Sequence, residues 1–177
     1  MARLHCHRFP TAFGEFTLVW CEPGTVHRVY LPGKGGALAE EYPGAGRRLN
    51  PSIRQVAEDI TRFLEGWDVR FSLDAVALGG CPGFQQRVLR AEYGIPRGFV
   101  STYRRIAEHV GCPGGSRAVG GALSGNPFPV IIPCHRAVRS DGGLGGYQGG
   151  LEMKRRLLEM EGVRVRGGRV DLGRVYY

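Results

Sequence analysis

The feature that most constrains the fold is a glycine-proline break near the middle of the chain, Gly-Gly-Cys-Pro-Gly at residues 79–83. Glycine accepts backbone angles that other residues avoid, and proline cannot continue a helix or a central strand. No regular element is therefore expected to run through this segment. The chain has 177 residues, a length that suits one large domain or two small ones. We predict two domains, residues 1–80 and residues 81–177.

The two parts differ in charge. Residues 1–80 hold nine basic and nine acidic side chains, whereas residues 81–177 hold 15 basic and seven acidic ones. The net charge of +8 therefore belongs entirely to the second part. A basic half beside a neutral half indicates one domain that faces a polyanion, although a solvated basic surface gives the same count. The hydrophobic share of 42% argues against a disordered chain.

The sequence also bears on location and on the cysteines. No apolar run is long enough to cross a bilayer, and the first residues lack the apolar core of a signal peptide. We therefore expect a soluble intracellular protein, cytoplasmic or, in a eukaryote, nuclear. Five cysteines at irregular spacing in a chain of this length do not form a disulfide framework. A thiol left over in a monomer is a candidate nucleophile, metal ligand or inert core residue.

The first part is predicted to be a small α/β domain. Two stretches rich in strand formers flank a turn, and a third follows, so we expect a hairpin and a further strand. These predicted strands are residues 3–9, 15–20 and 27–31. Asn50 followed by Pro51 is an N-cap and first-turn signal. Apolar residues then recur at helical spacing as far as Leu64, and Gly66 ends the predicted helix.

The second part is predicted to be mostly helical. The predicted elements are helices at residues 84–93, 102–110, 116–123 and 151–161 and a terminal hairpin at residues 163–166 and 169–172. A Gly-Cys-Pro-Gly-Gly turn joins the second and third of these helices. Two helices joined by a glycine-containing turn, in a basic half, resemble a helix-turn-helix.

The segment that carries chemistry is Asn-Pro-Phe-Pro-Val-Ile-Ile-Pro-Cys-His-Arg at residues 126–136, a strand-like apolar run that brings Cys134 and His135 side by side. A free cysteine has a pKa of about 8.5, so a reactive one needs a base or a positive field nearby. His135 can supply the base directly or through water, and Glu159 or Glu161 can orient its imidazole. Adjacent side chains on a strand point to opposite faces, so the alternative is a buried cysteine that merely precedes a histidine.

A wider set of motifs surrounds that pair. In chain order they are Arg-Ala-Val-Gly-Gly-Ala at 117–122, Asn-Pro at 126–127, Pro-Cys-His-Arg at 133–136, Gly-Tyr-Gln-Gly-Gly-Leu at 146–151 and Glu-Gly at 161–162. Together they resemble the methylated-DNA–protein-cysteine methyltransferases, the alkylguanine-DNA alkyltransferases of direct DNA repair. The match is dense over residues 84–162 and loose over residues 1–80. It implies a ribonuclease-H-like α/β N-terminal domain, a small sheet plus helix, and a mostly helical C-terminal domain with a winged-helix-like helix-turn-helix.

The resemblance also implies catalytic roles. Cys134 would accept the alkyl group, His135 would deprotonate it through a bridging water, and Glu161 would orient the imidazole. Asn126 would hold the active-site turn by hydrogen bonds. Tyr103 would donate a proton to N3 of the leaving guanine.

Further residues are implied in DNA binding and in the base pocket. Arg117 would fill the space left when the damaged nucleotide flips out of the duplex. The implied DNA-binding residues are Arg117, Tyr103, Arg104, Ser116, Ala118, Arg136 and Ser140. The implied substrate pocket consists of Ala137, Tyr147 and Gln148. Ala137 replaces the bulkier valine usual in the family and is expected to widen the pocket, and Gln148 stands where a small residue is common.

A metal site is one interpretation of a histidine- and cysteine-rich stretch in the first part. It contains His5, Cys6, His7, Cys21 and His27, which would cluster if the hairpin forms. Nitrogen and sulfur ligands suit tetrahedral zinc, and some members of the family carry a structural zinc in this domain. The alternatives are a Cys6–Cys21 cross-strand disulfide and plain strand residues. The reaction itself is expected to need no metal and no cofactor.

These features predict direct DNA repair by a monomer. The alkyl group of a 6-O-alkylguanine in double-stranded DNA would pass irreversibly and once only to Cys134. Two alternatives remain. A protein that binds the lesion without transfer would lack the acceptor cysteine, and a helix-turn-helix regulator would not need Pro-Cys-His-Arg. No membrane partner is expected.

Overall fold

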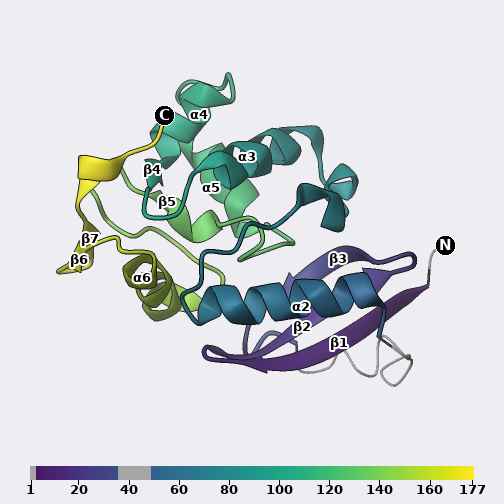
Figure 1. Cartoon of the computed structure of the whole chain (residues 1–177). Coiled ribbons are helices and arrows are strands. Elements are labelled where there is room, and N and C mark those ends of the chain that lie inside the picture. Colours follow the sequence, from purple (N-terminus) through teal and green to yellow (C-terminus); the bar gives the residue numbers. More distant parts are fainter. Residues whose placement is uncertain (1–2, 36–48) are drawn as a thin grey trace. The chain divides into compact units, whose positions relative to one another are not determined.

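The computed structural model describes residues 3–35 and 49–177, which fall into two compact units (Figure 1). The first unit comprises Met1–Gly80 and Pro127–Ile131, and the second comprises Cys81–Asn126 and Ile132–Tyr177. The segment Pro127–Ile131 is a difference from the predicted division, which assigns it to the second domain. It packs with the first unit because the Val29 amide donates a hydrogen bond to the Pro127 carbonyl (2.8 Å). No described helix is long and apolar enough to span a membrane.

The first unit is built on a three-stranded antiparallel sheet in the order β1-β2-β3, along which helix α2 lies (Figure 1). Its elements are β1 (Leu4–Thr11), β2 (Gly14–Cys21), β3 (Thr25–Tyr30), α2 (Pro51–Leu64) and the short 3-10 turns η1 (Leu73–Ala75) and η2 (Leu78–Gly80). The predicted hairpin and third strand are confirmed. Strand β2 is buried from Phe16 to Cys21, because it is the central strand of the sheet.

Helix α2 forms where the capping signal predicts it. The Asn50 side chain accepts a hydrogen bond from the Ser52 amide (2.9 Å), and Pro51 occupies the first turn, where no backbone donor is needed. The predicted apolar stripe is buried. Gly66 follows the helix with φ +97°, a left-handed angle that glycine accepts without strain, and the chain leaves the helical path there.

The alternative of a Cys6–Cys21 disulfide is contradicted by the structure, because the strand register keeps these residues apart. Cys6 pairs with Val19 and Cys21 pairs with Leu4, and both cysteines are thiols. Cys21 instead places its Sγ 3.1 Å from Nε2 of His27.

The two other histidines of the proposed zinc site pack against aromatic rings. The His5 ring packs on Trp20 with centroids 4.8 Å apart, and the His7 ring stacks on Phe9 at 5.6 Å. Among residues 3–35 and 49–177, no group of three or more histidine, cysteine or acidic side chains is placed to hold a metal ion. The structure therefore lends the zinc interpretation no support.

The second unit is mostly helical, as predicted. Its helices are α3 (Gly83–Gly94), α4 (Tyr103–His109), α5 (Ser116–Ser124) and α6 (Gly150–Met160), with 3-10 turns η3 (Cys134–Arg136) and η4 (Leu172–Arg174). The predicted terminal hairpin is β6 (Val165–Arg166) paired with β7 (Arg169–Val170). Thr102 caps α4 by accepting a hydrogen bond from the Arg105 amide (3.2 Å). An apolar cluster lies between these elements, formed by Val100, Val138, Leu144, Leu158, Val163 and Val170.

One small sheet in this unit has no counterpart in the prediction. Strand β4 (Ser101–Thr102) pairs in parallel with β5 (Ala137–Val138), with Ser101 opposite Ala137. The pair joins segments far apart in sequence, and two residues are too few to leave a periodic signal. It joins the residues just before α4 to those just after η3, so Tyr103 and Cys134 come to one place.

Replacing Asn50 with alanine should destabilise the first unit by about 1 kcal/mol, because the first turn of α2 loses its side-chain acceptor. Urea unfolding followed by circular dichroism measures the change in the free energy of unfolding. Ser52→Ala is the control, because the Ser52 backbone, and not its side chain, makes the capping bond. Equal losses in both variants would show that the cap does not stabilise the helix.

Candidate active site

Cys134 lies at a hollow of about 520 Å³ in the second unit. The hollow is lined by Tyr103, Ser116, Arg117, Gly120, Leu123, Ser124, Cys134, Gly146, Tyr147 and Gln148. These residues come from α4, α5, η3 and the loop before α6. The fold thus brings five of the predicted site residues besides Cys134 to one cavity, and the cavity is apolar enough to take a ring.

Cys134 and His135 lie on a 3-10 turn, and not at the end of a strand as the apolar run predicts. Val130 has φ +75°, an angle that a β-branched residue adopts only under strain, so the run cannot stay extended. The buried Asn126 side chain donates a hydrogen bond to the Ile132 carbonyl (3.1 Å), just before the turn. The same side chain hydrogen-bonds the Cys134 thiol. The turn is therefore held from within the unit.

Behind the turn, the carboxylate of Glu161 accepts hydrogen bonds from two side chains, His135 and Arg136. Glu161 Oε1 accepts from His135 Nε2 at 2.9 Å, and all three side chains of the His135–Glu161–Arg136 group are buried. Arg136 donates through Nε to Oε2 (2.9 Å) and through Nη2 to Oε1 (2.8 Å). A planar guanidinium bound to a carboxylate in this two-point manner also fixes the orientation of the carboxylate.

The charges in this group follow from its contacts. Burial opposes ionisation of Glu161, but His135 and Arg136 outweigh it and lower the pKa of Glu161 to about 2. Burial lowers the pKa of His135, against the opposing effect of Glu161. His135 is therefore a neutral imidazole at neutral pH. Because a carboxylate only accepts, Nε2 carries the hydrogen and Nδ1 is the acceptor nitrogen. Such a histidine can receive a proton.

Arg136, which the resemblance implied in DNA binding, makes its hydrogen bonds within the protein. Its side chain is buried, and besides Glu161 it donates through Nη1 to the Ile95 carbonyl (2.5 Å). Arg136 therefore acts inside the protein, where its positive charge keeps Glu161 ionised.

Cys134 and Tyr103 are both strongly affected by burial. Burial raises the pKa of Cys134 to about 12, although the hydrogen bond from Asn126 opposes the rise. Burial, together with neighbouring negative groups, raises the pKa of Tyr103 to about 12. The phenol packs so closely on Gly145 that a Cβ there would lie 2.5 Å from the Tyr103 hydroxyl. Tyr103 thus stays protonated and is held in place as a donor.

Sequence reasoning missed a buried lysine. Lys154 is fully buried on α6 and donates to the carbonyls of Ala137 (2.6 Å) and Gly146 (3.1 Å). The available signal was its place in the helix: Lys154 precedes the buried Leu157 and Leu158 by three and four residues, on the apolar face. Burial lowers the pKa of Lys154 to about 8.

Lys154 also changes the interpretation of Ala137. That residue is fully buried and does not line the hollow, and its carbonyl is taken by the lysine. The backbone carbonyl of Ala137, a residue implied in the substrate pocket, is therefore engaged in the interior. Gln148 does line the hollow, and its Nε2 donates to the Asn126 carbonyl (2.8 Å).

The remaining predicted DNA contacts lie on the surface. Arg117 and Ala118 are exposed on α5, whereas the next residue, Val119, is buried. Arg104 is exposed on α4, 4.0 Å from Glu108, and Ser140 is exposed after β5. Arg104, Ala118 and Ser140 do not line the hollow.

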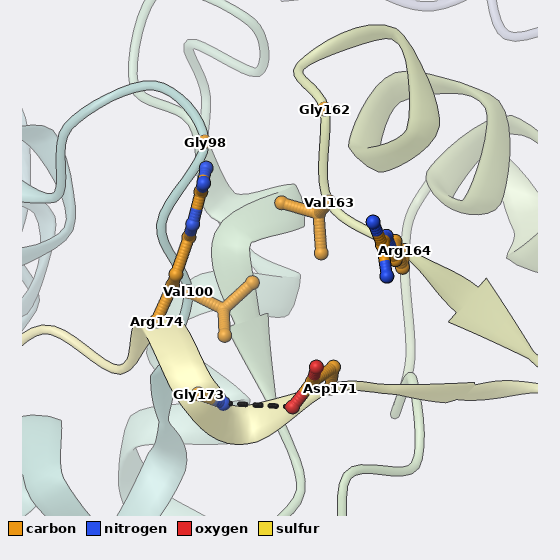
Figure 2. A pocket seen from close by; sticks show the side chains of 8 residues that line it. All are labelled: Gly98, Val100, Gly162, Val163, Arg164, Asp171, Gly173 and Arg174. Atoms are coloured by element: carbon orange, nitrogen blue, oxygen red, sulfur yellow. Dashed lines mark hydrogen bonds between the residues drawn. The ribbon is translucent and has the colours of Figure 1, made fainter.

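A second hollow, of about 300 Å³, lies where the end of α6 meets η4 (Figure 2). It is lined by Gly98, Val100, Gly162, Val163, Arg164, Asp171, Gly173 and Arg174. In Figure 2 the Asp171 carboxylate accepts a hydrogen bond from the Gly173 amide (2.9 Å). None of the predicted site residues lines this hollow, so the chemistry belongs to the hollow at Cys134.

Comparison with known proteins agrees with this geometry. Residues 83–163 match the sequence model of a family described as 6-O-methylguanine DNA methyltransferase, DNA binding domain. A methylated-DNA–protein-cysteine methyltransferase of Methanothermobacter thermautotrophicus is 43% identical over 86% of this chain and 82% of its own length. The chain belongs to the methylated-DNA–protein-cysteine methyltransferase family.

Other members of this family are also similar. A methyltransferase of Pyrobaculum aerophilum is 55% identical over 72% of this chain and 76% of its own length. Among solved structures, the Mycobacterium tuberculosis OGT in complex with DNA superposes with a TM-score of 0.70 at 28% identity, covering 89% of this chain and 92% of that one. The stretch matched by the methyltransferase family model contains every residue that lines the hollow at Cys134.

Glu161→Gln should remove the acid sensitivity that this carboxylate gives the fold. The folded pKa of about 2 lies below the unfolded value, so the stabilisation is present above about pH 4.5 and lost as pH falls toward 2. The difference between a pKa of 4.5 and one of about 2 corresponds to on the order of 3 kcal/mol. Urea unfolding at several pH values should show the variant less stable at pH 6 and the difference shrinking toward pH 3. A difference independent of pH would contradict this role.

Proposed function

We propose that this methyltransferase-family protein repairs DNA by moving the alkyl group of a 6-O-alkylguanine to the sulfur of Cys134. The observation that carries the proposal is the arrangement of Cys134, His135 and Glu161, with the thiol at a ring-sized hollow and the histidine-carboxylate pair buried behind it. The names of the relatives and the solved DNA complex of a family member support it.

The thiol needs help to ionise, because its pKa is raised to about 12 by burial. The neutral His135 accepts the thiol proton, directly or through a water, and Glu161 stabilises the imidazolium that forms. The buried Lys154 cation and the Asn126 hydrogen bond both favour the thiolate. Together these groups stabilise the thiolate in place of the solvent that is excluded from the buried sulfur.

In the transfer step the thiolate attacks the alkyl carbon that is bonded to O6 of guanine. A sulfur–carbon bond forms, the carbon–oxygen bond breaks, and its electron pair stays on the purine. Tyr103, which holds its proton because its pKa is near 12, donates that proton to the leaving guanine. The thioether has no leaving group that cellular thiols can displace, so each molecule acts once. No metal or organic cofactor enters this sequence.

Double-stranded DNA is the proposed partner, bound by the second unit. The lesion oxygen lies inside the base stack, so the nucleotide must flip out at a cost of a few kcal/mol. Arg117, exposed at the rim of the hollow, fills the vacated space, and exposed small residues of α5 such as Ala118 allow close approach to the minor groove. Tyr147 and Gln148 hold the flipped base, and Ser116, Arg104 and Ser140 contact the backbone.

We also propose a fold type for each of the two domains. We place residues 1–80 in a ribonuclease-H-like domain, supported by its antiparallel sheet and helix α2, and residues 81–177 in a winged-helix-like DNA-binding domain, supported by α4, α5 and the β6–β7 hairpin. We also propose an intracellular location, because the proposed substrate is DNA.

Incubation with a duplex that contains 6-O-methylguanine should add one methyl group to each protein molecule, on Cys134. Intact-mass and peptide mass spectrometry measure the number and the position. Cys134→Ser should abolish transfer and keep lesion binding, because a serine hydroxyl is far harder to deprotonate. Cys112→Ser is the matched control and should react normally. Repeated turnover, or methylation of Cys112, would refute the mechanism.

Arg117→Ala should slow repair of alkylated duplex DNA more than reaction with a free alkylguanine base, because the side chain acts in flipping and not in bond breaking. Arg90→Ala, the loss of an exposed positive charge on α3 outside the hollow, is the control. Rates on both substrates give the comparison. His135→Ala should slow both substrates alike. An equal loss on both substrates for Arg117→Ala would place this residue in the chemistry instead.

A further inference from the structure

Glu92 is a buried acid to which the proposed reaction assigns no role. It lies on α3, three and four residues after Leu89 and Val88, so it shares their buried face. Its side chain is fully buried, and neither carboxylate oxygen has a hydrogen-bond partner in the part of the chain that the structure describes. An isolated buried carboxylate is among the most unfavourable groups in a protein interior. Such a group beside a reactive centre calls for a chemical explanation.

The groups around Glu92 belong to the active site. Helix α3 packs against α4, α5 and η3, the turn that carries Cys134 and Arg136. The ionisable groups whose charge couples electrostatically to Glu92 are Lys154 on α6, Arg136 and Cys134 on η3, Tyr103 on α4 and Tyr177 at the C-terminal end. The Ala137 backbone also lies close to it, outside hydrogen-bond geometry. Arg136 is already engaged by Glu161. Lys154 is therefore the cation that Glu92 can offset.

Glu92 and Lys154 are coupled electrostatically without a direct hydrogen bond, and we treat them together as the Glu92–Lys154 pair. Burial decides the charge that each of them carries. It raises the pKa of Glu92 to about 8, against the attraction of Lys154 and Arg136. It lowers the pKa of Lys154 to about 8, against the attraction of Cys134 and Glu92. At pH 7 Glu92 is therefore a neutral acid and Lys154 a cation. The pair then carries one positive charge, which favours the Cys134 thiolate.

We propose that Glu92 controls the reactivity of Cys134 through its own protonation, and that its ionisation is what limits alkyl transfer at alkaline pH. The proposal rests on the function assigned above to Cys134. Glu92 touches neither the substrate nor the sulfur in this mechanism, so it acts as a positioning residue that sets the local charge. An ionised Glu92 disfavours the thiolate at Cys134 and the phenolate that Tyr103 would become.

The pH dependence follows from counting charge on the pair. As pH rises through 8 the pair changes from one positive charge to zero, whichever group loses its proton first, and then to one negative charge. With glutamine at position 92 the charge stops at zero. The wild-type protein and Glu92→Gln therefore match at low pH and separate above about pH 8. Without this device a thiol with a high pKa would only become more reactive as pH rises.

The test is the rate of reaction with a free 6-O-alkylguanine base between pH 6 and pH 10, which leaves DNA binding out of the measurement. The ratio of the Glu92→Gln rate to the wild-type rate should be near one at pH 6.5 and rise to about tenfold by pH 9.5, because one buried charge shifts a neighbouring pKa by about one unit. Glu159→Gln, the same change at an exposed position on α6, should keep a constant ratio. A constant ratio for Glu92→Gln would overturn the proposal.

A second variant and a stability measurement test whether charge, and not a new hydrogen bond, causes the change in rate. Glu92→Met cannot ionise and has no amide, so it should show the same rise if charge is the cause. A rise confined to the glutamine variant would instead indicate a new hydrogen bond and would overturn the proposal. Both variants should be at least as stable as the wild type at pH 8, because stability from the neutral acid is lost as pH rises through its folded pKa.

Iodoacetamide labelling separates this proposal from the proposed function. Its reaction with Cys134, mapped by peptide mass spectrometry, reports thiolate formation without any alkylguanine. If alkyl transfer to Cys134 fails in every variant, the proposed function fails, and the labelling ratio still tests Glu92. A labelling ratio that does not change with pH would overturn the charge control on its own.

Discussion

The buried contact between Glu161 and its two donors is the interaction on which the rest of the site depends. Arg136 neutralises and orients the carboxylate, and the carboxylate in turn fixes the hydrogen of His135 on Nε2. A charge of this kind is tolerated in the interior only when it is paired and hydrogen-bonded at the same time. Removal of Arg136 or of Glu161 alone would leave the opposite charge buried without its partner. The nucleophilic turn is therefore built into the folding of the second unit.

The hollow at Cys134 illustrates how stability and reactivity compete in this unit. Burial raises the pKa of the Cys134 thiol. The Asn126 hydrogen bond and the Lys154 cation oppose this rise, and the neutral His135 can accept the thiol proton. Lys154 is itself shifted toward its neutral form, and Glu92 is held as an acid without a hydrogen-bond partner in the described residues. An apolar pair would suit the core better. The persistence of two ionisable groups there is consistent with a role in the charge state of the sulfur.

Much of the local structure was predictable because its causes are local. The Asn50–Pro51 signal starts α2, the strand-forming runs pair as a hairpin, and the glycine-containing turn separates α4 from α5. The apolar run before Cys134 was mispredicted as strand-like for the opposite reason. Its backbone is bent by Val130 at a positive φ and by contacts of Asn126, and neither is visible in residue types alone.

The sequence by itself determined the family motifs, the order of the α-helices and of the strands outside the β4–β5 pair, and the candidate nucleophile, because each depends on residue type and short-range spacing. Only the tertiary structure decided which charged groups meet. Arg136 was predicted on DNA and lies buried against Glu161, and Lys154 and Glu92 carried no motif at all. Their placement near the sulfur depends on how α3, η3 and α6 pack together, and burial is what shifts the pKa values of Lys154 and Glu92. Contacts between segments far apart in the sequence depend on the whole fold, so the spacing of residue types along the chain does not predict them.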